Sequence, residues 1–555
     1  MLWQNVRFDC ARPVNLAMRR ILLTSALPYA NGPLHLGHIS EAVLTDIYAR
    51  ALRQQGHSVR YVCAHDAHGT PIMLKAQDAG VSPEELVAEV GREHRRDYAD
   101  FRIGFDNFHS THSAENEQAL GRIFQALDAA GLIDSREIEQ AWDPVKGMFL
   151  PDRFIRGTCP RCGAADQYGD ACEVCGATYE PLDLIDARSA LSGAAPEQKP
   201  STHYFFQLGK LEGFLRDWLA SAELQPAVRA KLGEWFEAGL KDWDISRDAP
   251  YFGFEIPGAP GKFFYVWVDA PVGYIASWMD LCQREGVDPW QAWQADDDTE
   301  IVHIIGKDIT YFHALFWPAM LHGAGLKPPS AVLAHGFVTV NGEKMSKSRG
   351  TFITARKYLD ALPAEYLRYY FAAKLGAGVD DIDLNLEDFR QRVNSDLVGK
   401  YVNIAARCAG FVKKLGGGRL ADTLDAPELV AEFAAAGEAI GAAYAARESG
   451  AAVRQIMALA DRANAYVAER APWALAKDPQ RTAEVLPVCT TALNLFRLLS
   501  LYLAPALPDT TAKVGEWLHG LPDWSQREAP LLGVEIAPYQ NLLARVDEAA
   551  VAALS

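Results

Sequence analysis

The chain has 555 residues, of which 49% are hydrophobic and 23% are charged, and its formal net charge is −17. This length predicts several domains, and the composition is that of an ordinary globular protein. The acidic balance argues against broad, non-specific coating of nucleic acid, so DNA is not an expected partner, although a local basic face is compatible with it. No apolar run approaches the ~18–20 residues of a membrane span, and we expect no membrane association.

The N-terminal sequence and the number of cysteines indicate the cellular compartment of the protein. The opening "MLWQNVRFDCARPVNLAMRR" lacks the hydrophobic core of a secretion signal, and we treat residues 1–18 as an N-terminal extension. Nine cysteines are too sparse for a disulfide scaffold on a chain of this size. Both features favour a reducing cytoplasm.

Residues 19–130 alternate between strand and helix patterns. "ILLTSA" and "HSVRYVCAHD" predict buried strands, and "HISEAVLTDIYARALRQQG" and "SPEELVAEVGREHRRDYADF" predict helices. This alternation predicts a parallel sheet with right-handed crossovers. The rhythm breaks over 131–245, which contains four paired cysteines. It resumes over 246–343, where "KFFYVWVDAP" and "IVHIIGKD" are strand-like, so an α/β domain split by an insertion is the economical interpretation.

The C-terminal third has a different character. After a basic loop and a linker over 344–388, the chain becomes rich in alanine, and "VRQIMALADRANAYV" repeats apolar residues at helical spacing. The pattern predicts a separate helical bundle over 389–545, followed by a tail over 546–555. The predicted fold class is therefore α/β, with an all-α domain behind it.

The stretch "LPYANGPLHLGH" (27–38) places two histidines where a predicted strand gives way to a helix. A helix N-terminus attracts phosphate, and His35 and His38 lie about one turn apart at that end. Gly37 between them lets a flat ligand approach the backbone. The junction suits a nucleotide whose phosphate charge grows during reaction. The alternative is a capped helix start with two hydrogen-bonded histidines.

The stretch "EKMSKSRG" (343–350) gathers Lys344, Lys347 and Arg349 among serines. Lysines on such a loop can neutralise a departing polyphosphate, although a charge run of this kind is also typical of a solvated loop. The P-loop pattern is missing from the sequence, so a P-loop NTPase is not supported.

Four cysteines have the spacing C-x2-C-x9-C-x2-C; they are Cys159, Cys162, Cys172 and Cys175. Four thiolates can close a tetrahedral zinc site with no open position, which indicates a structural rather than a catalytic metal. The alternatives are four unligated thiols or, less well supported, a redox pair.

The stretch 389–419 carries seven basic residues against one acid, Asp396. Lysine and arginine on one face neutralise the phosphates of a nucleic acid. The alternative is an ordinary solvated helix face.

These motifs together resemble a known family. "HLGH" followed far downstream by "KMSKS" resembles the paired signature of class I aminoacyl-tRNA synthetases. Six stretches in chain order are similar to the methionyl-tRNA synthetases, and the resemblance covers nearly all of 19–545; they are "ALPYANGPLHLGH", "AHDAHGTPI", "GTCPRCG", "YVWVDAPVGY", "IGKDITYFH" and "VNGEKMSKSRGTF". The resemblance implies a Rossmann-like catalytic domain in two halves (19–130 and 246–343), a connective insertion with a zinc knuckle, a KMSKS loop with a stem-contact linker, and a helical anticodon-binding domain.

The resemblance also implies site residues. The residues implied in ATP binding are His35, Gly37, His38, Lys344, Met345, Ser346, Lys347 and Ser348; those implied in catalysis are His35, His38, Lys344 and Lys347. Asp66 can hold the α-ammonium of methionine, and the implied walls of its pocket are Leu27, Tyr29, Trp267, Ala270, Pro271, Tyr274, Ile309 and His313. The implied anticodon contacts are Asn403, Arg407 and Trp473.

The activity implied is that of a methionine–tRNA ligase, with L-methionine, tRNA(Met) and ATP with Mg²⁺ as substrates and one structural Zn²⁺. Two other hypotheses stay open: an adenylyl-transferring nucleotidylyltransferase, which shares the histidine motif, and a non-catalytic tRNA-binding relative. The chain ends soon after the predicted bundle, without the oligonucleotide-binding-fold segment that dimerises many bacterial members, so we expect a monomer.

Overall fold

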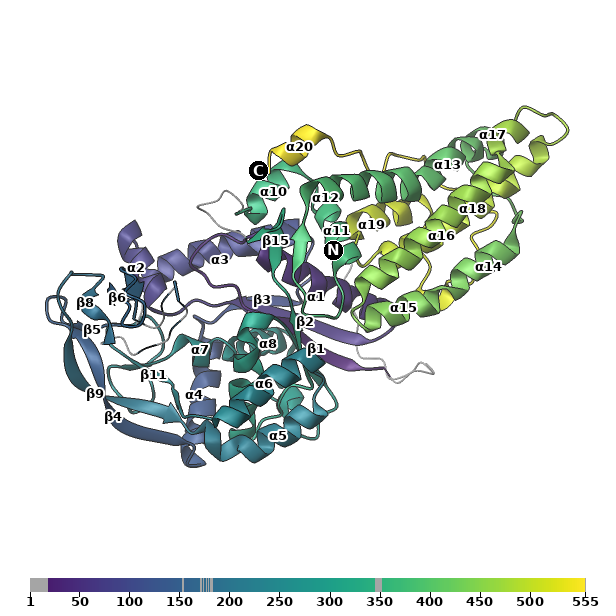
Figure 1. The fold of residues 1–555 in the computed structure, drawn as a ribbon. Helices are drawn as coiled ribbons and strands as arrows, with labels where there is room; N and C mark the ends of the chain where they lie inside the picture. The colour runs from purple at the N-terminus through teal and green to yellow at the C-terminus, as the bar shows by residue number, and fades with distance from the viewer. Residues whose placement is uncertain are drawn as a thin grey trace.

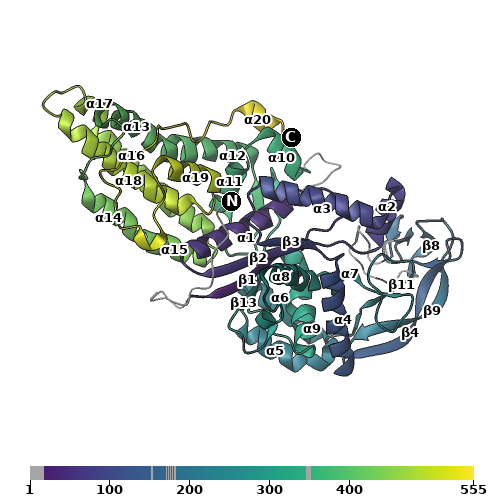
Figure 2. The same cartoon turned by 180° about the vertical axis from the view of Figure 1, so that it is seen from behind.

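The structure, a computed structural model, describes residues 18–151, 154–169, 172, 174–175, 177, 179, 183–344 and 352–554, without the side chain of Lys344. Five parallel strands form its central sheet in the order β14-β13-β1-β2-β3 (Figures 1 and 2). Their bounds in that order are Ala331–His335, Glu300–Gly306, Arg20–Ser25, Ser58–His65 and Asn107–Ser110. The strand order reverses between β1 and β13, the switch point at which open α/β sheets bind ligands. The predicted fold class is confirmed.

Alternate residues of these strands face two separate cores. Leu23 and Cys63 belong to the core under helix α1 (Leu36–Gln54). Leu22 and Val62 belong to the core on the other face, together with residues of α4 (Ala114–Ala129) and α8 (Val272–Glu285). Strands buried on both faces have continuous apolar sequences, which is why they are recognisable before the fold is known. The remaining helices of this part are α2 (Thr70–Ala79), α3 (Pro83–Asp100), α5 (Glu212–Ser221), α6 (Pro226–Ala238), α7 (Val266–Asp269), α9 (Trp317–Gly323) and α10 (Ala355–Ala361).

The insertion is an antiparallel ribbon. Strands β4 (Ile133–Asp143) and β9 (Glu197–Phe206) pair along nearly their whole length, and β5 (Met148–Phe149) and β10 (Trp243–Asp244) extend them to a four-stranded sheet. At the far end of the ribbon, β6 (Ile155–Thr158), β7 (Gln167–Tyr168) and β8 (Ile185–Ser189) form a small sheet of their own. In Figure 1 the ribbon lies at the lower left, on the opposite side of the molecule from the helices that follow residue 389.

The strand expected in "KFFYVWVDAP" is wrong beyond Phe264. Strand β12 (Lys262–Phe264) pairs with β11 (Ser246–Asp248), and the helical turn α7 follows at once. The backbone N–H of Val266 donates to the hydroxyl of Tyr251 at 3.0 Å instead of to a neighbouring strand. A short apolar run does not by itself distinguish a strand from a buried helix.

The Asn341-Gly342 pair in the sequence predicts a hairpin turn, and the structure contains it. Both residues have positive φ, 49° and 81°, and they join β15 (Val338–Val340) to β16 (Glu343–Lys344). Two positive φ values match the twist of a tight hairpin, and asparagine and glycine tolerate them best. Strand β17 (Ile382–Leu384) lies parallel to β15 on its other side.

Helix α11 (Ala364–Lys374) precedes β17, and helices make up most of the chain beyond that strand. The helices that follow β17 are α12 (Leu386–Arg392), α13 (Val402–Gly416), α14 (Pro427–Ala435), α15 (Gly437–Ala445), α16 (Ser449–Arg470), α17 (Pro472–Leu475), α18 (Thr482–Leu503), α19 (Pro508–Trp517) and α20 (Glu548–Ala552). A π-helical stretch, Val393–Tyr401, joins α12 to α13. One buried apolar cluster extends from the sheet face under α1 into this bundle.

Helix α18 corrects the expectation that no segment is apolar enough for a membrane. By length and composition alone it is a candidate span, with a mean hydropathy of 1.4 in its most apolar window. That window is 83% buried inside the protein. Its apolar residues pack against α13 and α16, and the ring of Phe496 stacks on Tyr401, the last residue of the π-helical stretch, with ring centroids 4.8 Å apart.

Candidate active site, metal centre and anticodon surface

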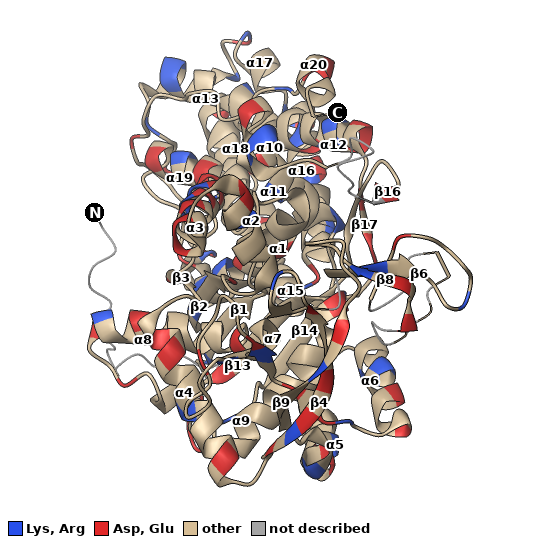
Figure 3. Cartoon of the chain, turned by 90° about the vertical axis from the view of Figure 1, so that its left-hand side faces the viewer, with Lys and Arg blue, Asp and Glu red and all other residues tan. Residues whose placement is uncertain are grey.

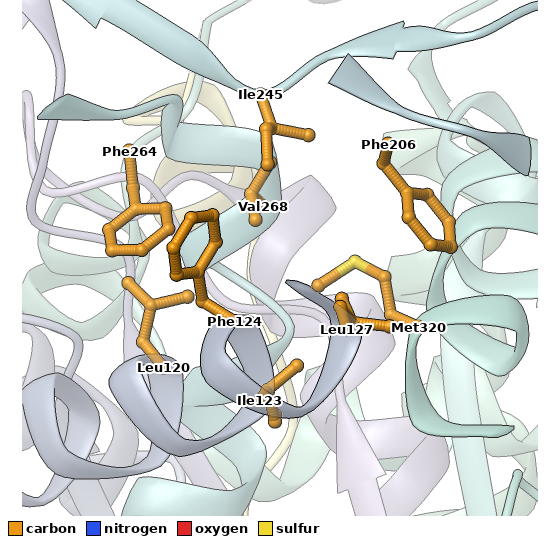
Figure 4. A pocket seen from close by; sticks show the side chains of 9 residues that line it. All are labelled: Leu120, Ile123, Phe124, Leu127, Phe206, Ile245, Phe264, Val268 and Met320. Atoms are coloured by element: carbon orange, nitrogen blue, oxygen red, sulfur yellow. The ribbon is translucent and has the colours of Figure 1, made fainter. Parts of the chain in front are cut away.

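The structure contains a small apolar cavity and a large mixed cleft. The cavity has a volume of about 10 Å³, and the nine side chains that Figure 4 labels around it are all apolar, four of them from α4. A void of this size is at the limit for a single water molecule. It is a packing gap of the core and offers no group that could react.

The large cleft has a volume of about 1410 Å³ and lies beyond the carboxyl ends of the parallel strands. It is lined by residues that directly follow strands, such as Ala26 after β1, Asp66 after β2 and Gly336 after β14. This edge of an open α/β sheet is where loops are free to bind ligands. Side chains of the ribbon, including Phe149 and His203, line its other wall.

The histidine junction forms one corner of this cleft. His35 is the N-cap of α1, and its Nδ1 accepts a hydrogen bond from the N–H of Gly37 at 3.0 Å. The Nδ1 of His38 accepts from the N–H of His35 at 3.3 Å, and the two rings stack with centroids 3.8 Å apart. Burial, with smaller contributions from His35 and His94, lowers the pKa of His38 well below its usual value. Because both Nδ1 atoms are acceptors, each neutral ring carries its proton on Nε2, where it can donate to an anion.

The segment that follows the lysine signature pairs with the histidine junction. Thr354 forms an antiparallel bridge with His35, and the ring of Phe352 lies edge-on to His35 at 5.3 Å. The lysine signature itself, Met345, Ser346, Lys347 and Ser348, lies outside the described residues, as does the side chain of Lys344. The backbone of Lys344 ends β16, opposite Thr339, which lines the cleft.

All nine residues predicted to bind methionine line the same cleft; they are Leu27, Tyr29, Asp66, Trp267, Ala270, Pro271, Tyr274, Ile309 and His313. Asp66 is bridged to Tyr29 through the backbone, and its Oδ1 is buried with no hydrogen-bond partner among the described residues. Burial, reinforced by Asp269, raises the pKa of Asp66 well above its usual value. An unpartnered buried carboxyl group of this kind fits a cationic ligand group, which would supply the missing partner.

The other side of the pocket is aromatic. The ring of Trp267 stacks on Phe312 at 4.3 Å, at an interplanar angle of 6°. Burial lowers the pKa of His313 to about 4, and its Nδ1–H donates to the carbonyl of Ile309 at 3.1 Å. The Nε2 of His313 therefore accepts from the hydroxyl of Tyr274 at 2.9 Å. The result is a buried wall of polarisable aromatic side chains, which suits an unbranched apolar ligand side chain.

Sequence reasoning missed several residues of the cleft. Glu41 and His335 form a buried pair at 2.8 Å, and Asp308 lines the cleft after β13. Burial of His335 would lower its pKa, but the hydrogen bond to Glu41 raises it overall. The available signal was position along the chain, because Asp308 ends the predicted strand "IVHIIGKD" and His335 ends β14.

The four cysteines converge as predicted, and their Sγ atoms all lie within 4.8 Å of one another. The Sγ atoms of Cys159 and Cys175 are 3.9 Å apart, and those of Cys162 and Cys172 are 3.5 Å apart. A tetrahedron of thiolates about 2.3 Å from a zinc ion has sulfur–sulfur distances of about 3.8 Å. Gly163, at a φ of 73°, closes the first knuckle turn. The donor set can therefore hold a tetrahedral metal ion.

The predicted anticodon residues lie at one end of the bundle, on α13 and α17. The guanidinium of Arg407 lies 4.6 Å from the ring of Trp473, which is 40% exposed. Asn403 lies one turn before Arg407 and donates to Asn464 on α16 at 3.3 Å. The structure thus brings Arg407 and Trp473 together.

The basic stripe over 389–419 is weaker than its sequence indicates. Four of its seven cations form ion pairs; the pairs are Arg390–Glu387, Arg392–Asp388, Lys400–Asp461 and Arg419–Asp422. Figure 3 shows acidic and basic segments next to one another at α12 and α20. Only part of the stripe's charge is therefore available to a phosphate backbone.

A parallel sheet with a histidine-capped helix at its switch point, a cysteine-bearing insertion and a helical bundle define a class I aminoacyl-tRNA synthetase. The profile of the family "tRNA synthetases class I (M)" matches residues 21–409, and that of the "anticodon binding domain of methionyl tRNA ligase" matches residues 419–547. The chain belongs to this methionyl family of class I tRNA synthetases. The predicted family and enzyme class, methionine–tRNA ligase, are confirmed.

Solved structures agree with this assignment. The chain is 26% identical to a Mycobacterium tuberculosis methionyl-tRNA synthetase in complex with methionyl-adenylate, with a TM-score of 0.78 over 95% of this chain and 99% of that one. A second methionyl-adenylate complex from the same organism is 25% identical, with a TM-score of 0.76 over 94% and 100% of the two chains. The apo form from that organism, at 23% identity and a TM-score of 0.71 over 96% and 100%, shares the fold.

Proposed function

We propose that the enzyme activates L-methionine with ATP to methionyl-adenylate, releases pyrophosphate, and transfers the methionyl group to the 3′-terminal adenosine of tRNA(Met). The observation that carries this proposal is the single cleft that holds the histidine junction and all nine methionine-binding candidates. The similar Mycobacterium tuberculosis enzymes in complex with methionyl-adenylate add support.

Electrostatics and positioning supply the catalysis in this proposal. Asp66 becomes ionised on binding the α-ammonium of methionine, and the aromatic wall around Trp267 takes the thioether. The Nε2–H groups of His35 and His38 donate to the α-phosphate as its charge grows in the transition state. Lys344 and Lys347 are assigned to the leaving pyrophosphate on their sequence motif. Mg²⁺ accompanies ATP.

Zinc is the proposed occupant of the four-cysteine cluster. Its support is the all-thiolate donor set and the sulfur–sulfur spacing, which suit a closed tetrahedral site. Cys159, Cys162, Cys172 and Cys175 would hold the ion, which would stiffen the small sheet at the end of the ribbon.

Asn403, Arg407 and Trp473 are proposed to read the anticodon of tRNA(Met). The exposed indole offers a face on which an unpaired base can stack, and the adjacent guanidinium offers charge to the backbone. We also propose that the enzyme is a cytoplasmic monomer and that its domains divide at about residues 19, 131, 246, 344, 389 and 546, as the sequence patterns indicate.

Methionine-dependent ATP–pyrophosphate exchange tests the activation step. The proposal predicts exchange that requires methionine and is not supported by leucine or valine. Exchange without any amino acid would favour a nucleotidylyltransferase. No exchange by zinc-loaded protein that still binds tRNA would favour a non-catalytic relative.

A further inference from the structure

Helix α3 contacts the segments on both sides of the histidine junction. On one side, His94 donates from Nε2 to the carbonyl oxygen of Gly32 at 2.8 Å, in the turn that precedes His35. His94 is 1% exposed, and its Nδ1 has no hydrogen-bond partner among the described residues. Burial lowers the pKa of His94, so the ring is neutral with its proton on the nitrogen that faces Gly32.

On the other side, residues 352–355 pair with the junction through an isolated antiparallel bridge. The N–H of Leu36 donates to the carbonyl of Ile353 at 3.1 Å, and the N–H of Ala355 donates to the carbonyl of Leu34 at 2.8 Å. Thr354, opposite His35, then caps α10 by accepting from the N–H of Lys357 at 3.1 Å. The position of His35 therefore depends on where α10 begins.

Arg356, in the first turn of α10, is bound to α3. Its Nε donates to Asp97 at 3.1 Å, and its Nη2 donates to Asp100 at 2.7 Å and to Asp97. The side chain of Asp97 is only 2% exposed, whereas that of Arg356 is 34% exposed. A buried carboxylate needs a well-placed cation, so this contact is more directional than a surface ion pair.

Helix α3 thus holds the turn before His35 through His94 and the bridged segment beside it through Arg356. Neither residue lines the cleft, so each would act on the substrate only through the segment it holds. Groups that stabilise a transition state must be held in place before it forms, and a displacement of about 1 Å can cost about a hundredfold in rate. We infer that α3 braces the histidine junction and that His94 and Arg356 are positioning residues for methionine activation. The inference rests on the proposed function.

A matched pair of substitutions at His94 provides the first test. The side-chain amide of glutamine lies near the position of Nε2 and can still donate to Gly32, whereas that of asparagine lies near Nδ1 and falls short. We expect His94→Asn to lower kcat for methionine-dependent exchange about ten- to hundredfold. We expect His94→Gln to recover most of that loss.

Arg356 provides the second test. Arg356→Gln removes the charge and should lower kcat for exchange, whereas Arg356→Lys should recover part of it. Arg92→Gln is the control on the same helix, because the ion pair of Arg92 with Glu89 is exposed, with 68% of the arginine side chain accessible. The control should exchange like wild type.

Methionine binding separates a positioning role from a merely structural one. Seven of the nine methionine-pocket residues follow β2, β12 and β13, and only Leu27 and Tyr29 follow β1, ahead of Gly32, so the dissociation constant of methionine, measured by calorimetry, should change far less than kcat in every variant. Wild-type kcat in both His94→Asn and Arg356→Gln would overturn the inference, and so would a loss of methionine binding that matches the loss of exchange. If the wild-type enzyme itself showed no methionine-dependent exchange, the proposed function would fail instead.

Discussion

Arg368 and Asp46 form an ion pair from which water is excluded. The Nη2 of Arg368 lies 2.6 Å from the Oδ2 of Asp46, and both side chains are 0% exposed. Asp46 lies on α1, which begins at the histidine junction, and Arg368 lies on α11. The guanidinium also donates to the carbonyls of Pro505 and Ala506 in the bundle, at 2.8 and 3.1 Å. One arginine thus joins α1 to the helical bundle.

Asp46→Asn should destabilise the protein strongly. It leaves the buried charge of Arg368 without its counter-charge, and such a loss costs about 3–5 kcal/mol. Denaturant unfolding followed by circular dichroism measures the change. The control is Arg102→Gln, which breaks the exposed pair with Asp509 and should cost only ~0–1 kcal/mol. Equal effects of the two substitutions would mean that burial of the Asp46 pair does not matter.

Methionine binding should release protons at pH values below the raised pKa of Asp66. The pKa of Asp66 is raised in the free enzyme by burial and then by Asp269, so the carboxyl group is protonated until the pH exceeds that raised value. The ligand ammonium requires the ionised form, so affinity should increase with pH and level off above the free-enzyme pKa.

Calorimetry in buffers of different ionisation enthalpy measures this proton release. Asp66→Asn should bind methionine more weakly and release no proton. A binding enthalpy that is the same in every buffer for the wild-type enzyme would rule out the linkage.

Lys347→Ala should slow adenylate formation by about two to three orders of magnitude, as expected for the loss of a charge that stabilises the transition state. Methionine affinity should stay at the wild-type value, because the motif is assigned to the phosphates. Single-turnover formation of the adenylate is the measurement. A wild-type rate would remove Lys347 from the mechanism.

Trp473→Ala should impair tRNA charging and spare pyrophosphate exchange. Stacking of a base on an aromatic ring is worth about 1–3 kcal/mol, which corresponds to roughly a 5- to 150-fold increase in KM for tRNA. Trp473→Phe keeps a smaller stacking face, so its KM for tRNA should lie between those of the wild-type enzyme and Trp473→Ala. Equal losses in charging and in exchange would indicate that Trp473 serves stability instead.

Cys175→Ser should empty the metal site. We expect elemental analysis to find one zinc ion per wild-type chain and close to none in the variant, with faster proteolysis between residues 155 and 189. The control is Cys282→Ala, which removes a buried thiol from α8 and should keep its zinc. A Cys175→Ser variant with full zinc content would contradict the assignment.

The sequence was most informative where a local pattern decides the structure. The central strands, the Asn341-Gly342 turn and the cysteine spacing depend on nearby residues, and the structure contains all three. The strand predicted beyond Phe264 was wrong because a helical turn and a strand can have the same short apolar sequence. Phe312 was not recognised as part of the aromatic wall for a similar reason, since a phenylalanine in an apolar run is typical of any core.

Contacts between residues far apart in the sequence could not be predicted from it. Glu41 and His335 are 294 residues apart, and Lys400 and Asp461 are 61 apart, so neither pair leaves a local pattern. Asp66 stood out only through the family resemblance, because a strand-end aspartate is common. Its unpartnered oxygen became visible only in three dimensions.

The apolar interior that runs without interruption from the sheet through α1 into the bundle limits how this chain can be dissected. A fragment that stops before the bundle would expose a broad apolar surface to solvent. We expect such a fragment to aggregate rather than to fold into an active enzyme. Engineering aimed at shortening this protein should therefore trim the far end of the ribbon, where Ile155 and Leu184 belong to a small apolar cluster separate from the two main cores.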